Sequence, residues 1–125
     1  MLLIPGSVRV FVARESVDMR KSFEGLSNQV QFVLGQDPLN GHVYVFLNKR
    51  KTLVKMLVWT RGGYTIVYKR LERGQFAFPS RVASETSAAV SIDMRELSML
   101  LEGVDLVRAR VHRRWEPKRP RTSAA

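Results

Sequence analysis

Apolar and polar residues alternate in several short segments of the chain, and a period of two is typical of half-buried β-strands. The first such segment is Val8–Ala13. Three more follow one another closely, separated by short polar connections that suit hairpin turns: His42–Asn48, Leu53–Thr60 and Tyr64–Leu71. The pattern therefore predicts a three-strand antiparallel meander and at least one further strand.

Two other segments repeat their apolar residues at the helical period of 3.6. One runs from Asp18 to Leu34, with Ser16 as a candidate N-cap and Gly35 as the stop signal. The other runs over Asp93–Glu102, where its first residue and Glu96 have the spacing of a capping box. We expect both helices to pack on the sheet.

Together these elements predict an α+β fold, in which a twisted antiparallel sheet (the meander plus one or two further strands) carries two packed helices. A short additional strand is a candidate at Gln75–Pro79, followed by a Ser/Ala-rich connection over Ser80–Val90. Val104–Trp115 is consistent with either an edge strand or a basic arm. With 125 residues, the chain fits one domain over 1–107, and residues 108–125 are expected to be a basic arm ending in a disordered tail.

The turns suggest how the meander pairs. If Leu47 faces Val54 and Gly62-Gly63 forms a two-residue turn, one face of the sheet is apolar: Val43, Val45, Leu47, Val54, Met56, Val58, Val67 and Leu71, with Lys69 as the exception. The opposite face then changes from aromatic at Trp59 to basic at Lys55, directly across from Arg70.

Composition removes several classes of protein. No cysteine is present, which excludes disulfide frameworks, cysteine-ligated zinc and thiol nucleophiles. No apolar run approaches the roughly 20 residues of a membrane helix, and the N-terminus does not resemble a signal peptide, so we expect a cytoplasmic protein without membrane contact. The net charge of +10 indicates a polyanionic partner.

The positive charge is concentrated in two blocks. Residues 41–74 carry eight basic side chains against Glu72 alone, and residues 108–125 carry seven against Glu116. Residues 1–40 are balanced, and residues 75–107 have an excess of three acidic groups. A solvated edge that deters aggregation is the plainer interpretation of the first block. Its excess of charge favours nucleic-acid contact instead.

Catalytic chemistry has little support. His42 and His112 lie far apart, and capping or turn formation accounts for Asp18, Asp37 and Asp93. A two-metal nuclease needs several carboxylates converging on one site, and no phosphate-binding glycine loop is present. We expect no enzyme activity, no metal and no cofactor.

The basic blocks supply the candidate site. Lysine acts on phosphate as a point charge and arginine as a fork, and both blocks could contact a DNA backbone. Aromatic residues between them (Tyr44, Phe46, Trp59, Tyr64 and Tyr68) could stack on exposed bases or pack beneath a helix. The predicted nucleic-acid-binding residues are Asn48, Lys49, Arg50, Lys51, Lys55, Arg61, Lys69, Arg70, Arg73, Arg113, Arg114, Lys118 and Arg119.

Six sequence blocks follow one another in order: Asp18–Lys21 with Gly25–Leu26, Asp37–His42, Val45–Arg50, Lys55–Trp59, Tyr68–Phe76 and Leu100–Asp105. With these blocks, about residues 8–105 resemble the small accessory protein of IS66-class bacterial insertion sequences, the product of the second open reading frame. The resemblance implies a role in transposition beside a separate transposase, which carries the strand-transfer chemistry. It supplies no catalytic residues.

The favoured hypothesis is therefore a non-catalytic transposition protein that binds DNA, at element ends or nonspecifically, or the transposase–DNA complex. One alternative is a protein-interaction module that docks on the transposase through an exposed apolar patch near Trp59 and Tyr68. A cryptic nuclease or an RNA-binding regulator is the other. An unpaired edge strand also leaves a homo-oligomer open.

Overall fold

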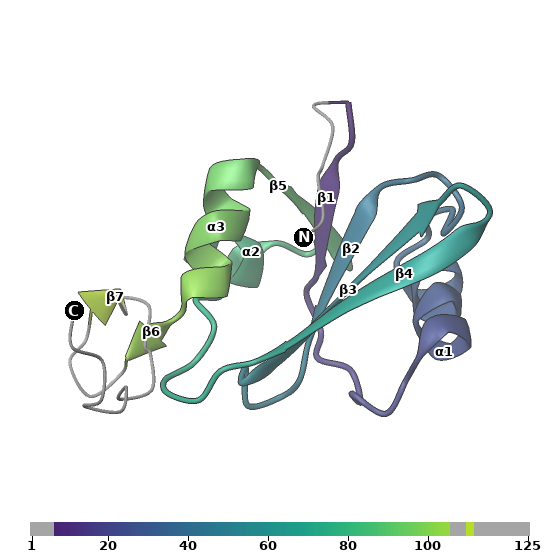
Figure 1. Ribbon diagram of the computed structural model, residues 1–125. Coiled ribbons are helices and arrows are strands. Elements are labelled where there is room, and N and C mark those ends of the chain that lie inside the picture. Colours follow the sequence, from purple (N-terminus) through teal and green to yellow (C-terminus); the bar gives the residue numbers. More distant parts are fainter. Residues whose placement is uncertain (1–6, 106–109, 112–125) are drawn as a thin grey trace, which may run out of the picture.

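The computed structural model describes residues 7–105 and 110–111. Its centre is a five-stranded mixed sheet with strand order β4-β3-β2-β1-β5 (Figure 1). The strands are β1 Val10–Ala13, β2 Val43–Leu47, β3 Leu53–Thr60, β4 Gly63–Arg70 and β5 Ala89–Ile92. A separate two-stranded sheet consists of β6 Val104–Asp105 and β7 Arg110–Val111. The predicted α+β class is confirmed.

One pairing differs from the expected antiparallel sheet. Strand β1 pairs parallel with β2 and antiparallel with β5. A parallel pair needs a crossover connection, and here the chain between β1 and β2 forms that connection with a helix. Strands β2, β3 and β4 form the predicted antiparallel meander.

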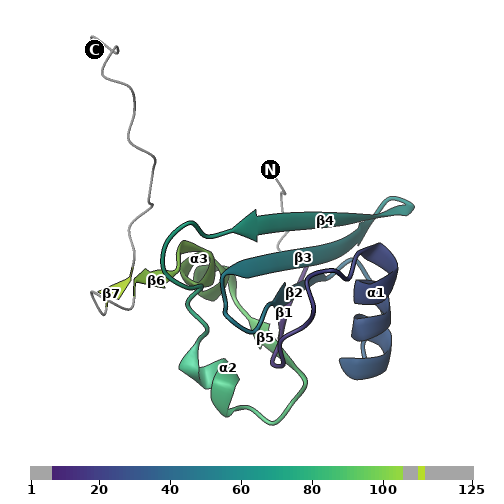
Figure 2. The same cartoon turned by 90° about the horizontal axis from the view of Figure 1, so that it is seen from below.

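Helices cover both faces of the sheet (Figure 2). Helix α1 (Phe23–Asn28) continues directly into the π-helix η1 (Gln29–Val33), and both lie on one face. The short helix α2 (Ser80–Ser84) and helix α3 (Met94–Glu102) lie on the other. The sheet is therefore the middle layer of three.

Alternation along the strands sends side chains into two cores. Toward α3, the residues predicted for the apolar face pack around Leu97 and Leu100 of that helix. Toward α1, Phe11, Tyr44 and Phe46 pack around Leu26 and further apolar residues of α1 and η1. Because both faces are covered, β1 and β2 are buried along their full length and read as continuous apolar runs.

Several predicted boundaries change. The first helix begins at Phe23, not near Asp18, and its N-cap is Ser22 instead of Ser16. Residues 18–21 form a turn, in which the Asp18 carboxylate accepts a hydrogen bond from the backbone N–H of Arg20 at 2.9 Å. Gln75–Pro79 is not a strand; only Gln75 forms an isolated bridge, to Val104. The connection predicted at Ser80–Val90 contains α2 and the start of β5.

The second helix begins as predicted. The Asp93 carboxylate accepts from the Glu96 backbone N–H at 2.7 Å, and the Glu96 carboxylate accepts from the Asp93 N–H at 3.0 Å. The reciprocal bonds confirm the capping box. Glu96 also pairs with Arg81 at 2.8 Å, which ties α2 to α3.

Of the two strand pairings in the meander, the one between β2 and β3 is as predicted and the one between β3 and β4 is shifted. Leu47 lies opposite Val54, as expected. Between β3 and β4, however, the two-residue turn is Arg61-Gly62, because Thr60 pairs with Gly63. Pairing shifts by two residues, which leaves every side chain on its predicted face but changes its neighbour. Lys55 therefore lies opposite Tyr68 instead of Arg70.

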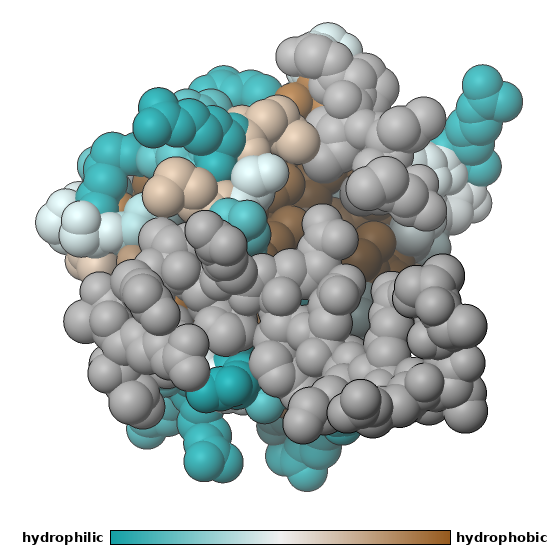
Figure 3. Space-filling view, turned by 60° about the vertical axis from the view of Figure 1, so that its left-hand side comes forward, coloured by the Kyte–Doolittle hydropathy of each residue, from teal (hydrophilic) through white to brown (hydrophobic). Residues whose placement is uncertain are grey.

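Figure 3 views the molecule from the side of α3. Hydrophilic side chains project from the lower edge of the molecule, where β1 and β2 end.

Within the part of the chain that the structure describes, no helix is long and apolar enough to span a bilayer.

Candidate nucleic-acid interface

The turn between β2 and β3 is built around the side chain of Asn48. Its Oδ1 accepts hydrogen bonds from the backbone N–H groups of Thr52 and Leu53, at 2.8 and 2.9 Å. Its Nδ2 donates to the Thr52 hydroxyl at 3.1 Å. Asn48 thus uses its amide inside the turn and holds the loop shape, a structural role in place of the predicted nucleic-acid contact.

A second segment clamps the same turn from outside. Gln75 donates from Nε2 to the Arg50 carbonyl at 2.7 Å, and the Phe76 N–H donates to the Lys51 carbonyl at 2.7 Å. Leu71 donates its N–H to the Thr52 carbonyl at 3.0 Å. Phe76 is itself 2% exposed in the core, so the clamp is anchored in the body of the protein. The turn is therefore fixed on both sides.

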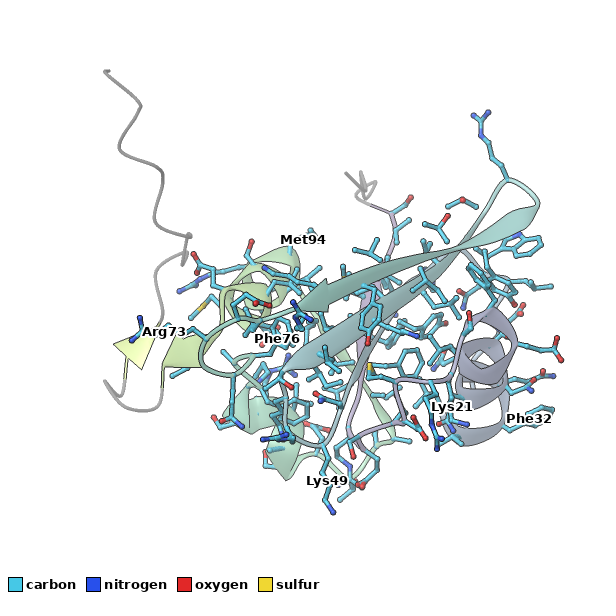
Figure 4. All side chains as sticks on the ribbon, turned by 60° about the horizontal axis from the view of Figure 1, so that its bottom comes forward. Lys21, Phe32, Lys49, Arg73, Phe76 and Met94 are labelled. Atoms are coloured by element: carbon cyan, nitrogen blue, oxygen red, sulfur yellow. The ribbon has the colours of Figure 1, made fainter. Side chains whose placement is uncertain are left out.

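This clamped turn presents three successive cations. Lys49 and Arg50 are exposed, and Lys49 points away from the body into solvent (Figure 4). The Lys51 ammonium lies 5.1 Å from the centre of the Phe78 ring, a cation–π contact that leaves the charge in place. No ion pair between described residues involves any of the three.

The loop after β1 brings another cation to this edge. Val17 donates its N–H to the Leu47 carbonyl at 3.0 Å, which places residues 14–22 beside the end of β2. Lys21 follows in that loop and lies on the same edge as Lys49 (Figure 4). The sequence interpretation put Lys21 inside a helix and did not select it; the basic pair Arg20-Lys21 was the available signal.

The carboxylates of these loops are neutralised close by. Glu15 pairs with Arg14, and Glu72 pairs with Arg70. Asp18 pairs with Arg20, and the hydrogen bond from that guanidinium lowers the pKa of the Asp18 carboxyl to about 2. We define the cationic edge as the loops that follow β1, β2 and β4, residues 14–22, 48–52 and 71–79. Its charge excess is carried mainly by Lys21, Lys49, Arg50 and Lys51.

Lys55 is the main correction to the predicted site. It is 8% exposed, and its ammonium donates to the carbonyls of Met19 and Lys21 at 2.7 and 2.8 Å. The same ammonium lies 4.6 Å from the centre of the Tyr68 ring. Lys55 therefore holds the loop after β1 against the sheet and does not reach a phosphate.

Two of the other predicted cations lie away from the cationic edge, and two lie at it. Arg61 lies in the turn at the far end of β3, and a strand of this length separates it from the clamped turn by about 25 Å. Lys69 donates to the Leu101 carbonyl at 3.1 Å, near the end of α3. Arg70 lies at the end of β4 that borders the cationic edge. Arg73 follows in the loop, on the side of the two-stranded β6–β7 sheet (Figure 4). Arg61 and Lys69 therefore lie apart from the clamped turn.

The predicted second contact cannot be located. Arg113, Arg114, Lys118 and Arg119 lie outside the described residues. Their contribution stays a prediction from the sequence.

Two of the five aromatic residues that the sequence suggested for base stacking are packed inside. Tyr44 and Phe46 are fully buried beneath α1 and η1, which excludes them from base stacking. Burial also raises the pKa of the Tyr44 hydroxyl. Trp59 and Tyr64 pack edge to face at 4.9 Å, whereas Tyr68 remains 54% exposed.

Within the described ranges, no group of three or more His, Cys, Asp or Glu residues could hold a metal ion. His42 accepts a hydrogen bond at Nδ1 from the Arg9 backbone N–H, at 3.0 Å. Asp37 accepts from the Leu39 N–H in its turn at 2.9 Å. Together with the roles of Asp18 and Asp93, this confirms turn formation and capping as the use of these carboxylates.

The chain is similar to two curated proteins and matches one family model. The chain is 39% identical over 100 residues to uncharacterized protein y4hO of Sinorhizobium fredii, covering 79% of this chain and 83% of the relative. It is 33% identical over 113 residues to uncharacterized protein y4jC of the same organism, covering 90% and 91%. No solved structure matches. The family model described as IS66 Orf2 like protein matches residues 8–111. The chain therefore belongs to the IS66 Orf2-like family, whose proteins are accessory to transposition.

Proposed function

We propose that this protein binds DNA during transposition through the cationic edge, without catalysing strand transfer. Phosphate contacts fix a protein on DNA and need cations that are not already neutralised. Lys49 and Arg50 meet that requirement in full, and Lys51 keeps its charge against a ring. Lys21 extends the same edge along the loop after β1.

The observation that carries the proposal is the rigidity of the turn. Long basic side chains lose conformational freedom on binding, and a fixed backbone reduces what must be ordered further. Here the Asn48 amide and the bonds from Gln75 and Phe76 fix the backbone beneath three adjacent cations. A turn whose only purpose was solvation would not require such a clamp.

The test is a fluorescence-anisotropy titration of a labelled duplex at several salt concentrations. Neutralising Z phosphates gives a slope of about −0.9Z in a plot of log affinity against log salt. We expect a slope of about −3 to −4 from the four cations of the edge, steeper if the basic C-terminal segment also binds.

The matched variants are K49Q/R50Q/K51Q and R61Q. The triple variant is expected to reduce the slope by about 2.7, whereas Arg61→Gln is expected to leave the slope unchanged, against the loss of about 0.9 that one phosphate contact would give. A flat salt dependence, or equal slopes for the wild type and the triple variant, would contradict the proposal.

A second candidate function is docking on the transposase. Phe32 of η1 is 74% exposed and points outward (Figure 4), and its neighbour Val33 is 51% exposed. The expected apolar patch near Trp59 and Tyr68 is a poorer candidate, because Trp59 is packed against Tyr64. Nuclease-treated pull-down of the element's own transposase, compared between the wild type and Phe32→Ser, separates this function from DNA binding.

A further inference from the structure

Two cross-strand pairs form a small surface at one end of β3 and β4. Leu53 lies opposite Arg70, and Lys55 lies opposite Tyr68. Alternate residues of a strand share a face, so all four side chains lie on the side of the sheet that α1 covers farther along. They occupy the end of that face nearest the clamped turn, since Leu53 directly follows Thr52.

Tyr68 is the exposed aromatic residue of this surface. Its side chain lies on the edge strand and is 54% exposed, although Lys55 across from it is buried. The Lys55 ammonium lies 4.6 Å from the ring centre and is fixed by two backbone carbonyls. The ring is therefore held in place from the protein side, while the rest of it faces solvent.

Beside the ring is a shallow pocket lined by Leu53, Tyr68 and Arg70. Leu53 supplies an aliphatic wall, Tyr68 an aromatic one, and Arg70 a guanidinium. The Arg70 Nε donates to the Glu72 carboxylate at 2.6 Å, which orients the guanidinium and balances its charge. The cations of the clamped turn lie just before Leu53 in the chain. An aromatic platform near exposed cations is the combination that single-stranded nucleic acid uses, with one base stacked and a phosphate paired.

We propose that this pocket binds one unpaired nucleobase of a DNA strand, stacked on Tyr68, with the flanking phosphates on the Lys49–Lys51 turn. The inference rests on the proposed function, since it assigns the same edge a preference for strands with unpaired bases. Bases inside a duplex are stacked on one another and cannot enter the pocket. The ligand is therefore a single strand or the frayed end of a duplex.

The test compares a short labelled single strand with a duplex of the same sequence, by anisotropy. Stacking on one aromatic residue predicts that Tyr68→Ala weakens single-strand binding by roughly 10-fold or more, and weakens duplex binding by less than about 2-fold. Tyr68→Phe keeps the ring and is expected to retain most of the single-strand affinity. Tyr68→Leu keeps an apolar cover over Lys55 without a ring, and is expected to resemble Tyr68→Ala.

A second readout, tryptophan fluorescence, keeps an aromatic side chain at position 68. In a Tyr68→Trp variant, the indole is expected to be quenched by the single strand and not by the duplex. Equal single-strand affinity of the wild type, Tyr68→Ala and Tyr68→Leu would overturn the inference alone. If the protein bound neither the single strand nor the duplex, the proposed function would be overturned instead.

Discussion

The two turns that bracket β3 share one backbone feature and differ in how they are held. Each contains a basic residue with positive φ, Lys51 at 58° before the strand and Arg61 at 42° after it. The first turn is held by the Asn48 side chain and by the segment that ends at Phe76. The Arg61-Gly62 turn has no such clamp among the described residues and simply joins two paired strands.

The difference shows that charge along a sequence does not define a surface. Arg61 and Lys49 contribute equally to the net charge of the block, yet topology puts them at opposite ends of a strand. Around Lys49, the parallel pairing of β1 and β2 brings a second loop to the same edge. A basic turn becomes a binding site when neighbouring loops clamp it and add to its charge.

Reversing the charges on each turn should separate the contributions of the two turns to duplex binding most clearly. K49E/R50E/K51E is expected to lower duplex affinity by about 100-fold near 100 mM salt, because three contacts become three repulsions. Arg61→Glu is the control and is expected to lower it by less than about 3-fold. Anisotropy at fixed salt measures both, and comparable losses would show that the two turns are equivalent.

Removal of the buried cation tests what holds the edge together. Lys55→Met removes two charge-assisted hydrogen bonds to Met19 and Lys21 and is expected to destabilise the protein by about 2 kcal/mol. Limited proteolysis should then cut within residues 14–22. Lys49→Met is the matched control, with an expected change within about 0.5 kcal/mol in chemical denaturation. Equal stability of both variants would contradict the structural role of Lys55.

A subtler test loosens each turn without changing its charge. Asn48→Ala removes the internal hydrogen bonds of the first turn, and Gly62→Ala puts a side chain at φ 83° in the second. Both are expected to cost about 1 to 1.5 kcal/mol of stability. Only Asn48→Ala is expected to weaken DNA binding, by about 3-fold. If Gly62→Ala weakens binding as much, rigidity of the first turn is not what matters.

The smallest expected effect lies away from both turns and is a pH dependence. The hydrogen bond from the Asp93 backbone N–H, and then the bonds from Arg81, lower the pKa of Glu96 below its usual 4.5. Stability from this carboxylate is thus complete above pH 4.5 and is lost as the pH falls through the lower folded-state value. In thermal unfolding, the melting temperature of Glu96→Gln should fall less steeply than that of the wild type as the pH is lowered below 4.5. Glu102→Gln is the control, and an identical decline in both variants would contradict the assignment.

Local patterns predicted the elements that local physics determines. The β3 boundaries and the capping box at Asp93 follow from alternation and from side-chain spacing, and both match the structure. The face of each meander residue was also predictable, because a register shift of two preserves it. The shift itself was not, since Arg61 adopts a left-handed conformation that a sequence would assign to glycine.

Features set by tertiary contacts were missed. A strand, a helix and another strand in succession are compatible with the parallel β1–β2 pair, but an antiparallel sheet was expected. The first helix begins at Phe23 because residues 18–21 form a turn whose carbonyls of Met19 and Lys21 bind the buried Lys55. That contact joins residues far apart in the chain, so no local pattern reveals it.

The same reasoning applies to the positions of the predicted site residues. The place of Lys49, Arg50 and Lys51 at a surface turn was predictable, because a polar hairpin turn lies at the surface wherever the strands go. Lys55 was misassigned because an alternating strand does not reveal which polar side chain finds carbonyl partners in the interior.

Amide chemical-shift mapping of the labelled protein with a short duplex locates the DNA-binding surface residue by residue. We predict perturbations concentrated in residues 18–21, 48–52 and 71–76, with the Arg61-Gly62 turn and α3 unchanged. Shifts centred on Arg61-Gly62 or on α3, with the clamped turn silent, would contradict DNA binding through the cationic edge.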